Sequence, residues 1–321
     1  MCYNYGDSKI SRIEGLFMKK ENKKTLGLIL IIILIVVSCI GLFFVLINLN
    51  KEEKVSDEII FTKENLPRVD ASLATQPLVD AFMLNFTGKT TEELNIEYTN
   101  THPGYVKLVN NETDLIVVTS PSEEELELAK EKGIELDVTK VVNEGFVFFV
   151  NKENEIDNVT LEQIQKIYTG EITNWKELGG PDREIIAYQR PVNSGSQTGL
   201  INLVMKGLQI KIPTVKESVE LTMAGIVDYV ADYENGIDAI GYSYYYYANE
   251  MYWNDGLKYL GINGVKPNYQ TIQNETYPIL TAYYIVTRKG ETNENVLKLK
   301  EAMLSKRGQV VAREAGYVPI K

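Results

Sequence analysis

The sequence predicts an α/β protein with an apolar segment near its N-terminus. The chain has 321 residues, which is long enough for two globular units, because domains usually contain about 100 to 200 residues. After residue 65, apolar runs typical of strands alternate with patterns of helical spacing, as in α/β architectures. With 44% hydrophobic and 24% charged residues, this body can bury an ordinary core.

The N-terminal segment has the length and composition of a membrane anchor. No charged residue occurs from Leu26 to Ile47, and a helix over this stretch would be about 33 Å long, against a hydrocarbon core of about 30 Å. Lysines just before it favour a cytoplasmic N-terminus and an extracellular body. We therefore expect a cytoplasmic segment over residues 1–25, a transmembrane or signal-anchor helix over 26–48 and a linker over 49–65.

A lipid anchor is the alternative. The stretch "VVSC", which ends at Cys39, resembles the lipobox of bacterial lipoproteins, whose cysteine is lipidated and becomes the new N-terminus. Met18 would then be the true start. The residues after Cys39 stay apolar, whereas the apolar region of a signal peptide usually spans only about 7 to 15 residues, and this favours an uncleaved helix. Either anchor places the body at the outer face of the cell membrane.

Composition excludes several kinds of site from the body. Cys2 and Cys39 are the only cysteines and His102 is the only histidine, so disulfide frameworks, cysteine metal sites and histidine zinc clusters are excluded. A Ser-His-Asp triad would need His102. The first 50 residues carry six basic and three acidic side chains, so of the total net charge of −11 the rest of the chain carries −14. That charge repels phosphate backbones and excludes nucleic acid as an expected partner.

Local patterns predict the elements of the body in order. Thr75 and Pro77 mark the start of a helix with apolar residues at helical spacing, and a short buried strand follows over 114–119. Ser122 and Glu125 form a capping box for the next helix. Further along, the chain predicts strands over 144–152, 184–189, 239–247 and 278–287, and helices after Thr160 (in a capping box with Gln163), over 227–236 and over most of 295–320.

Three loops of one design are candidates for binding an anion. In each, an extended run ends, small hydroxyl residues follow and a helix begins, over 72–75, 119–122 and 194–196. The N-terminus of a helix presents unpaired N–H groups and a partial positive charge, and Ser and Thr hydroxyls add donors. Serine and threonine also cap helices in general, so for each loop taken alone an ordinary helix start is the favoured interpretation.

Arg190 distinguishes the third loop. The stretch "RPVNSGSQT" places Arg190 four residues before Ser194, and Gly195 lets the backbone come close to a ligand. A guanidinium group is permanently charged and binds an oxyanion with two parallel hydrogen bonds. This stretch therefore predicts an oxyanion site, with a surface charge beside a helix start as the alternative.

With these motifs the chain resembles the phosphate-binding proteins of ABC phosphate importers, the PstS-like branch of the type II periplasmic-binding-protein superfamily. The resemblance covers about 66–320 and includes "RPVNSGSQT", "IYTGEITNWKELGG", "AIGYSYYYY" and "LSKRGQVVAREAGYVPI". It implies a PBP-like domain over 66–321 whose two lobes are joined by hinge crossover strands near 143–150 and 279–287. Lobe I would comprise about 66–143 plus 287–321, and lobe II about 150–279.

The same resemblance implies a function. It implies that a monomer captures inorganic phosphate, or a related oxyanion, between its lobes and delivers it to an ABC permease at the membrane, with no cofactor, no metal and no catalytic step. Carried over residue by residue, the implied phosphate contacts are Ser72, Leu73, Thr101, Thr119, Ser120, Arg190, Ser194, Gly195 and Ser196.

Thr119 departs from the family pattern. Many members carry an aspartate at this position, which accepts the proton of hydrogen phosphate and so rejects sulfate. Neither Thr119 nor Ser120 is acidic, so either a hydroxyl accepts that proton or discrimination is weaker. We predict relaxed selectivity. His102 is a further candidate anion ligand, with a surface histidine as the alternative.

Three other functions compete with transport. A sensor or accessory protein would keep the same pocket without a permease. A serine phosphoesterase would use Ser194 or Ser196 with His102 as base, although G-x-S-x-G and S-x-x-K motifs are missing. A structural ectodomain would keep only a vestigial pocket. The tyrosine run over 242–247 invites a carbohydrate-stacking role, but strand propensity favours a strand whose alternate tyrosines face core and solvent.

Overall fold

The computed structural model describes residues 35–38, 41, 58–213, 222–232 and 236–320. The chain divides into two compact units, Met1–Lys54 and Val55–Lys321. The expected anchor helix over 26–48 lies outside the described residues except for a few helical positions, and so does Cys39. Within the described ranges, no helix has both the length and the apolar character needed to cross a bilayer.

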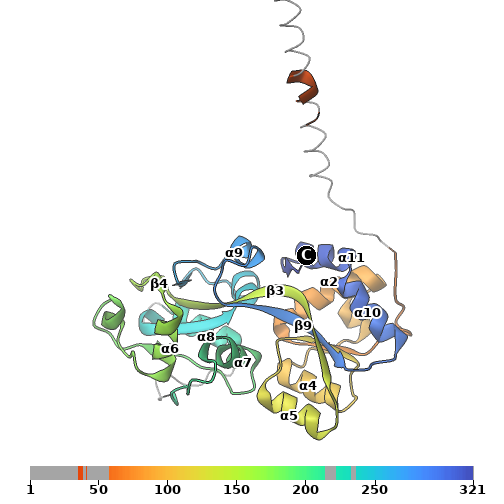
Figure 1. The fold of residues 1–321 in the computed structure, drawn as a ribbon, viewed down its shortest axis with the longest axis horizontal. Coiled ribbons are helices and arrows are strands. Elements are labelled where there is room, and N and C mark those ends of the chain that lie inside the picture. Colours follow the sequence, from red (N-terminus) through yellow and green to blue (C-terminus); the bar gives the residue numbers. More distant parts are fainter. Residues whose placement is uncertain (1–34, 39–40, 42–57, 214–221, 233–235, 321) are drawn as a thin grey trace, which may run out of the picture. The chain divides into compact units, whose positions relative to one another are not determined.

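The second unit is built on a mixed sheet of eight strands (Figure 1). Strand β3 pairs with β9 through its first part and with β6 and β7 through its last part, so one strand belongs to both lobes. This arrangement confirms the predicted two-lobed α/β fold. The strands in spatial order are β1 (Val69–Ala71), β2 (Leu115–Val118), β9 (Leu280–Arg288), β3 (Leu136–Asn151), β6 (Ala239–Tyr244) and β5 (Ile186–Ala187), with β10 (Val318–Pro319) and β7 (Leu257–Tyr259) also paired to β3.

Helices surround each half of the sheet (Figure 1). The lobe that contains β1 and β2 carries η1 (Leu73–Thr75), α2 (Gln76–Thr87), α3 (Thr91–Leu94), α4 (Thr101–Val109), α5 (Glu123–Glu131), α10 (Glu294–Leu304) and α11 (Lys306–Glu314). The lobe that contains β5 and β6 carries β4 (Asn158–Val159), α6 (Leu161–Thr169), η2 (Trp175–Leu178), α7 (Gly195–Gly199), the π-helical η3 (Leu200–Met205), α8 (Met223–Ala231), η4 (Gly236–Asp238), η5 (Tyr247–Met251), β8 (Gly261–Ile262) and α9 (Tyr269–Gln273).

Capping predicted from the sequence is present in the structure. Ser122 Oγ accepts from the backbone N of Glu125 at the start of α5, and the Glu125 side chain accepts from Ser122 N. Thr160 and Gln163 form the same reciprocal pair at the start of α6. Two N–H groups at each helix start are therefore satisfied by side chains, which explains why these helices begin where the sequence predicts.

The tyrosine run differs from its prediction. Strand β6 ends at Tyr244, and the chain then turns into η5 instead of continuing as a strand to Tyr247. Ser243 is buried between the buried Tyr242 and Tyr244, and Tyr247 is buried as well, so the expected alternation of core and solvent is wrong. The reason is the position of β6 between β3 and β5, where every residue of the strand is covered.

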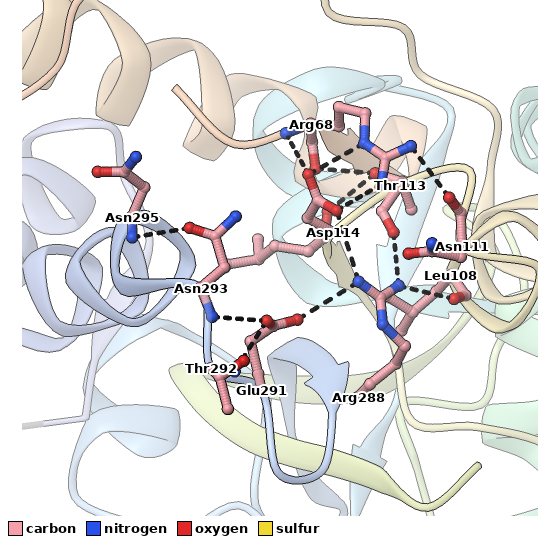
Figure 2. Close-up of polar contacts among 11 residues, drawn as sticks. Arg68, Leu108, Asn111, Thr113, Asp114, Arg288, Glu291, Thr292, Asn293 and Asn295 are labelled. Atoms are coloured by element: carbon pink, nitrogen blue, oxygen red, sulfur yellow. Dashed lines mark hydrogen bonds and ion pairs between the residues drawn. The ribbon is translucent and has the colours of Figure 1, made fainter. Parts of the chain in front are cut away.

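A polar network joins the ends of several elements at one edge of the first lobe (Figure 2). The Arg68 side chain donates to both Asp114 oxygens, at 3.0 and 2.6 Å, just before β2. Arg288, at the end of β9, donates to the backbone oxygens of Leu108 and Thr113 at 3.0 and 2.8 Å, and its other branch lies 3.4 Å from Asp114. Asp114 thus links two arginines and, through them, β2, β9 and the C-terminal end of α4.

We expect Asp114→Ala to lower the free energy of unfolding by about 1 to 3 kcal/mol, because two arginines would lose their shared, largely buried carboxylate. Urea unfolding followed by fluorescence measures the change. Asp182→Ala is the matched control, since Asp182 pairs with Lys176 but both side chains are exposed, and pairs of that kind contribute at most about 1 kcal/mol. Equal losses in the two variants would contradict a structural role for the network.

Candidate anion-binding site

The first predicted loop is fixed at the ends of β1 and β2. Ser72 N donates to Val117 O at 3.1 Å, and Ser72 Oγ lies 3.0 Å from Thr75 Oγ1. Ser72 and Thr75 are both buried. The Leu73 side chain is exposed, so Leu73 can offer an anion only its backbone N–H group. The loop is therefore rigid, with its hydroxyls bonded to each other.

Thr101, a phosphate contact implied by the family resemblance, begins α4. Its N-cap residue Asn100 has a φ of 75°, and no described side chain caps the first turn. The helix therefore presents N–H groups together with the positive end of its dipole. Thr101, the first residue of α4, is buried at this end.

Thr119 follows β2 and has a buried hydroxyl. Tyr105, on α4, donates to the Thr119 backbone oxygen at 2.8 Å and so ties the loop to that helix. Within the described part of the chain, Thr119 Oγ1 has no hydrogen-bond partner at normal geometry. Ser120 beside it is half-buried. A buried hydroxyl that lacks a partner is costly, and this favours a role in holding a ligand.

The arginine loop is anchored from within the second lobe. Arg190 N donates to Gln197 Oε1 at 2.9 Å and lies 3.0 Å from Tyr242 Oη. Ser194 Oγ accepts from Gln197 N at 3.3 Å and caps α7. Ser196, in the first turn, is buried, and its Oγ has no hydrogen-bond partner among the described residues. This helix continues without a break into η3.

The arginine side chain is half-buried beside two tyrosines. Its Nε and Nη1 atoms are shielded from solvent, and its charge acts on the hydroxyls of Tyr242 and Tyr247. Burial raises the pKa of both phenols, and the Arg190 charge opposes that effect. The guanidinium is therefore held in a low-dielectric setting, where its attraction for an anion is stronger than at the surface.

Gly195 brings the two lobes together. A methyl group at Gly195 would lie 2.6 Å from Thr119 Oγ1 and 2.7 Å from Thr101 Oγ1. The start of α7 therefore faces the start of α4 and the end of β2, from opposite lobes. Only a residue without a side chain fits there. The described contacts do not place Ser72, Leu73 or Ser120 against Gly195.

His102 contacts α5. Its Nδ1 lies 3.2 Å from Glu125 Oε1, and the Glu125 side chain is 1% exposed. Burial raises the pKa of Glu125, while hydrogen bonds from Ser122 and His102 oppose the rise. His102 is thus the partner of a buried carboxyl group, which does not support its expected alternatives as an anion ligand or as a base for Ser194 or Ser196.

Sequence reasoning missed several residues that hold the site. Tyr105, Gln197 and Tyr242 fix its backbone, and Tyr244 Oη donates to Gly195 O at 2.9 Å. Gln197 follows Ser194 by three residues, as in a capping box, and this signal was available. The tyrosines carried no comparable signal. In the described ranges, no cluster of three or more His, Cys, Asp or Glu side chains is arranged to hold a metal ion.

Comparison with known proteins agrees with this fold. A curated relative from Borreliella burgdorferi, named phosphate-binding protein PstS, is 26% identical over 266 residues, covering 80% of this chain and 91% of the relative. A relative of the same name from Staphylococcus saprophyticus is 26% identical over 259 residues, covering 78% of this chain and 79% of the relative.

Solved structures support the same architecture. A phosphate-bound protein from Clostridium perfringens, assigned as the substrate-binding protein of a phosphate ABC transporter, superposes with a TM-score of 0.62 at 24% identity, over 79% of this chain and 98% of its own. An ABC-type phosphate transport receptor from Vibrio cholerae gives a TM-score of 0.60 at 19% identity, over 81% of this chain and 99% of its own. The family model of the PBP superfamily domain matches residues 66–306, and the chain therefore belongs to the PBP superfamily.

Proposed function

We propose that this chain is a membrane-tethered extracellular solute-binding protein that captures inorganic phosphate, or a related oxyanion, between its two lobes and delivers it to an ABC permease. The observation that carries the proposal is the meeting of Thr101 and Thr119 from one lobe with Gly195 from the other. Relatives named phosphate-binding proteins support the choice of ligand.

The chemistry of the cluster suits a tetrahedral oxyanion. Thr101, Thr119 and Ser196 contribute hydroxyls, α4 contributes free N–H groups, and Arg190 contributes charge. Hydrogen bonds to a charged group contribute about 1.5 to 3 kcal/mol each, so a few of them on one ion give micromolar affinity or better. The net charge of −11 does not prevent binding, because screened surface charges act weakly on a buried site.

The tether and the permease are part of the same proposal. The apolar stretch over residues 26–48 would hold the body at the outer face of the membrane, either as an uncleaved helix or through lipidated Cys39. The intact mass of the protein extracted from membranes distinguishes the two anchors, since cleavage at Cys39 removes 38 residues and adds lipid.

A catalytic role for the serines has little support. Ser194 Oγ caps α7, and His102 bonds to Glu125 instead of a serine. A serine hydrolase needs its nucleophile within hydrogen-bond reach of a base. We therefore expect stoichiometric binding without turnover. Hydrolysis of a phosphate ester that is lost in Ser196→Ala would establish the phosphoesterase instead.

We expect Arg190→Ala to weaken phosphate binding at least tenfold, or about 1.4 kcal/mol, because the variant loses the partly buried positive charge of the site. Calorimetric titration of the full chain in detergent with phosphate measures the change. Arg183→Ala is the matched control, since Arg183 pairs with Asp238 at the surface of the same lobe and should leave affinity unchanged. If Arg190→Ala binds phosphate with the same dissociation constant as the wild type, Arg190 does not take part in binding.

A further inference from the structure

Tyr317 connects the segment after α11 to the first predicted loop, over 72–75. It lies just before β10 and is 1% exposed. Its hydroxyl donates to Ala74 O, in η1, at 3.0 Å. Ala74 follows Ser72 and Leu73, two of the phosphate contacts implied by the family resemblance. A buried tyrosine from a distant part of the sequence therefore holds the backbone of this loop.

The first predicted loop emerges from the sheet beside the loop that carries Thr119. Strand β1 pairs in parallel with β2, and Ala71 is opposite Val117. Thr75 Oγ1, in η1, donates to Val117 O at 2.6 Å. Neighbouring parallel strands end at the same edge of a sheet, so the residues after β1 lie next to the residues after β2. The loop that Tyr317 holds therefore borders the proposed site on the side of the first lobe.

Tyr244 makes the same kind of bond in the other lobe. It ends β6 and is 2% exposed. Its hydroxyl donates to Gly195 O, in the arginine loop, at 2.9 Å. Each lobe thus has a buried tyrosine whose hydroxyl bonds to a backbone oxygen of a predicted anion loop.

The rings of the two tyrosines belong to one aromatic cluster beside the crossover strands. Tyr283, on β9, contacts both, with its ring centroid 5.5 Å from that of Tyr244 and 6.0 Å from that of Tyr317. Tyr244 also packs edge-on against Phe146 of β3 at 5.5 Å, and Tyr317 stacks on Tyr246 at 3.6 Å. Close packing of this kind restricts the rings, so both hydroxyls have a defined direction.

A bond to a backbone oxygen also fixes the groups on either side of it. The peptide group that contains Ala74 O includes Thr75 N, and Thr75 Oγ1 lies 3.0 Å from Ser72 Oγ. The peptide group that contains Gly195 O includes Ser196 N, and the Ser196 hydroxyl is buried without a partner among the described residues. A loop that is ordered before the ligand arrives loses less freedom on binding, and this strengthens the affinity.

We propose that Tyr317 and Tyr244 are positioning residues, one in each lobe, which hold the first predicted loop and the arginine loop in the shape that receives the anion. The inference rests on the proposed function. Each tyrosine acts through the backbone of its own loop and not by contact with the anion.

Tyr317→Phe and Tyr244→Phe test the proposal, because each removes one hydroxyl and keeps the packed ring. Calorimetric titration of the full chain in detergent measures phosphate affinity, and urea unfolding checks that each variant is folded. We expect each variant to bind phosphate about three- to tenfold more weakly than the wild type.

Tyr277→Phe is the matched control for both variants. The buried Tyr277 hydroxyl donates to a backbone oxygen as well, but its acceptor is Phe146 O of β3, at 3.1 Å, outside the predicted anion loops. We expect this variant to unfold at a lower urea concentration, as the other two do, and to bind phosphate like the wild type.

Double variants distinguish positioning from a general loss of stability. If Tyr317 acts through its own loop, Tyr317→Phe weakens binding less than about twofold in a Ser72→Ala background but by its full factor in a Ser196→Ala background. For Tyr244→Phe the two backgrounds exchange roles. A general loss of stability gives the same factor in both.

The outcomes separate this proposal from the proposed function. Normal phosphate binding by Tyr317→Phe or by Tyr244→Phe overturns the proposal. Equal factors in the two serine backgrounds overturn it as well, and so does an equal loss of affinity in Tyr277→Phe. A wild type that does not bind phosphate contradicts the proposed function itself.

Discussion

Gly195→Ala will bind phosphate at least about a hundredfold more weakly than the wild type, a loss of about 2.7 kcal/mol. The added methyl group would lie 2.6 Å from Thr119 Oγ1 and 2.7 Å from Thr101 Oγ1, closer than carbon and oxygen approach without bonding. Either the hydroxyls turn away or the lobes separate. Both responses remove donors from the anion and fill the space it would occupy.

Calorimetric titration of the full chain measures this loss, and Gly104→Ala supplies the control. Gly104 lies in the first turns of α4, near the same site, but a methyl group there meets its nearest described neighbour only at 3.8 Å. Alanine also favours a helix over glycine by about 1 kcal/mol. We therefore expect Gly104→Ala to bind normally and to unfold at slightly higher urea concentration. Normal binding by Gly195→Ala would show that the two lobes do not hold the anion here.

Capping boxes and apolar runs predicted the helices and strands whose limits are set by residues adjacent in sequence. Helix α5 begins at its predicted capping box, and β2 coincides with its apolar run. The first part of β3 was missed, because "LDVTKVVN" mixes polar and apolar residues and remains partly exposed where it pairs with β9. Pairing between distant segments, which no local pattern encodes, makes this stretch a strand.

The candidate site also combines features set by residues adjacent in sequence with features set by contacts between distant segments. Small hydroxyl residues before helices identified Thr119 and the loop around Gly195 as candidates, because the chemistry of a helix start is local. Thr101 was implied only by the family resemblance. Tyr244 was taken for an ordinary strand residue. Its hydroxyl reaches Gly195 only because β6 pairs with β3 in a register that sets Tyr244 opposite Phe146. That register depends on the whole sheet, so sequence reasoning could not supply it.

Glu144 is another residue whose role depends on the fold. It lies on β3 opposite Thr281 of β9, where the chain passes between the lobes, and it is 2% exposed. Its Oε1 accepts from Gly145 N at 2.8 Å and from Tyr246 N at 3.3 Å. Within the described ranges it forms no ion pair. Burial raises the pKa of Glu144 to about 8, despite the opposing effect of these N–H groups.

This shift makes stability depend on pH in a defined direction. Between the ordinary value of 4.5 and about 8, the unfolded chain releases the Glu144 proton while the folded chain keeps it. The folded state therefore binds more protons, and the free energy of unfolding falls as pH rises through this window. Each unit of pKa difference corresponds to about 1.4 kcal/mol. Above about pH 8 both states are ionised and the loss stops growing.

Glu144→Gln should remove this dependence, because glutamine resembles the protonated carboxyl group and keeps an acceptor for Gly145 N and Tyr246 N. Near pH 5 we expect the variant and the wild type to have the same free energy of unfolding. Near pH 8 we expect the free energy of unfolding of the variant to be higher by about 2 to 4 kcal/mol. Urea unfolding at a series of pH values measures both curves. Glu301→Gln, on the exposed face of α10, should follow the wild type throughout. Parallel curves for Glu144→Gln and the wild type would mean that Glu144 is already ionised in the folded protein at neutral pH.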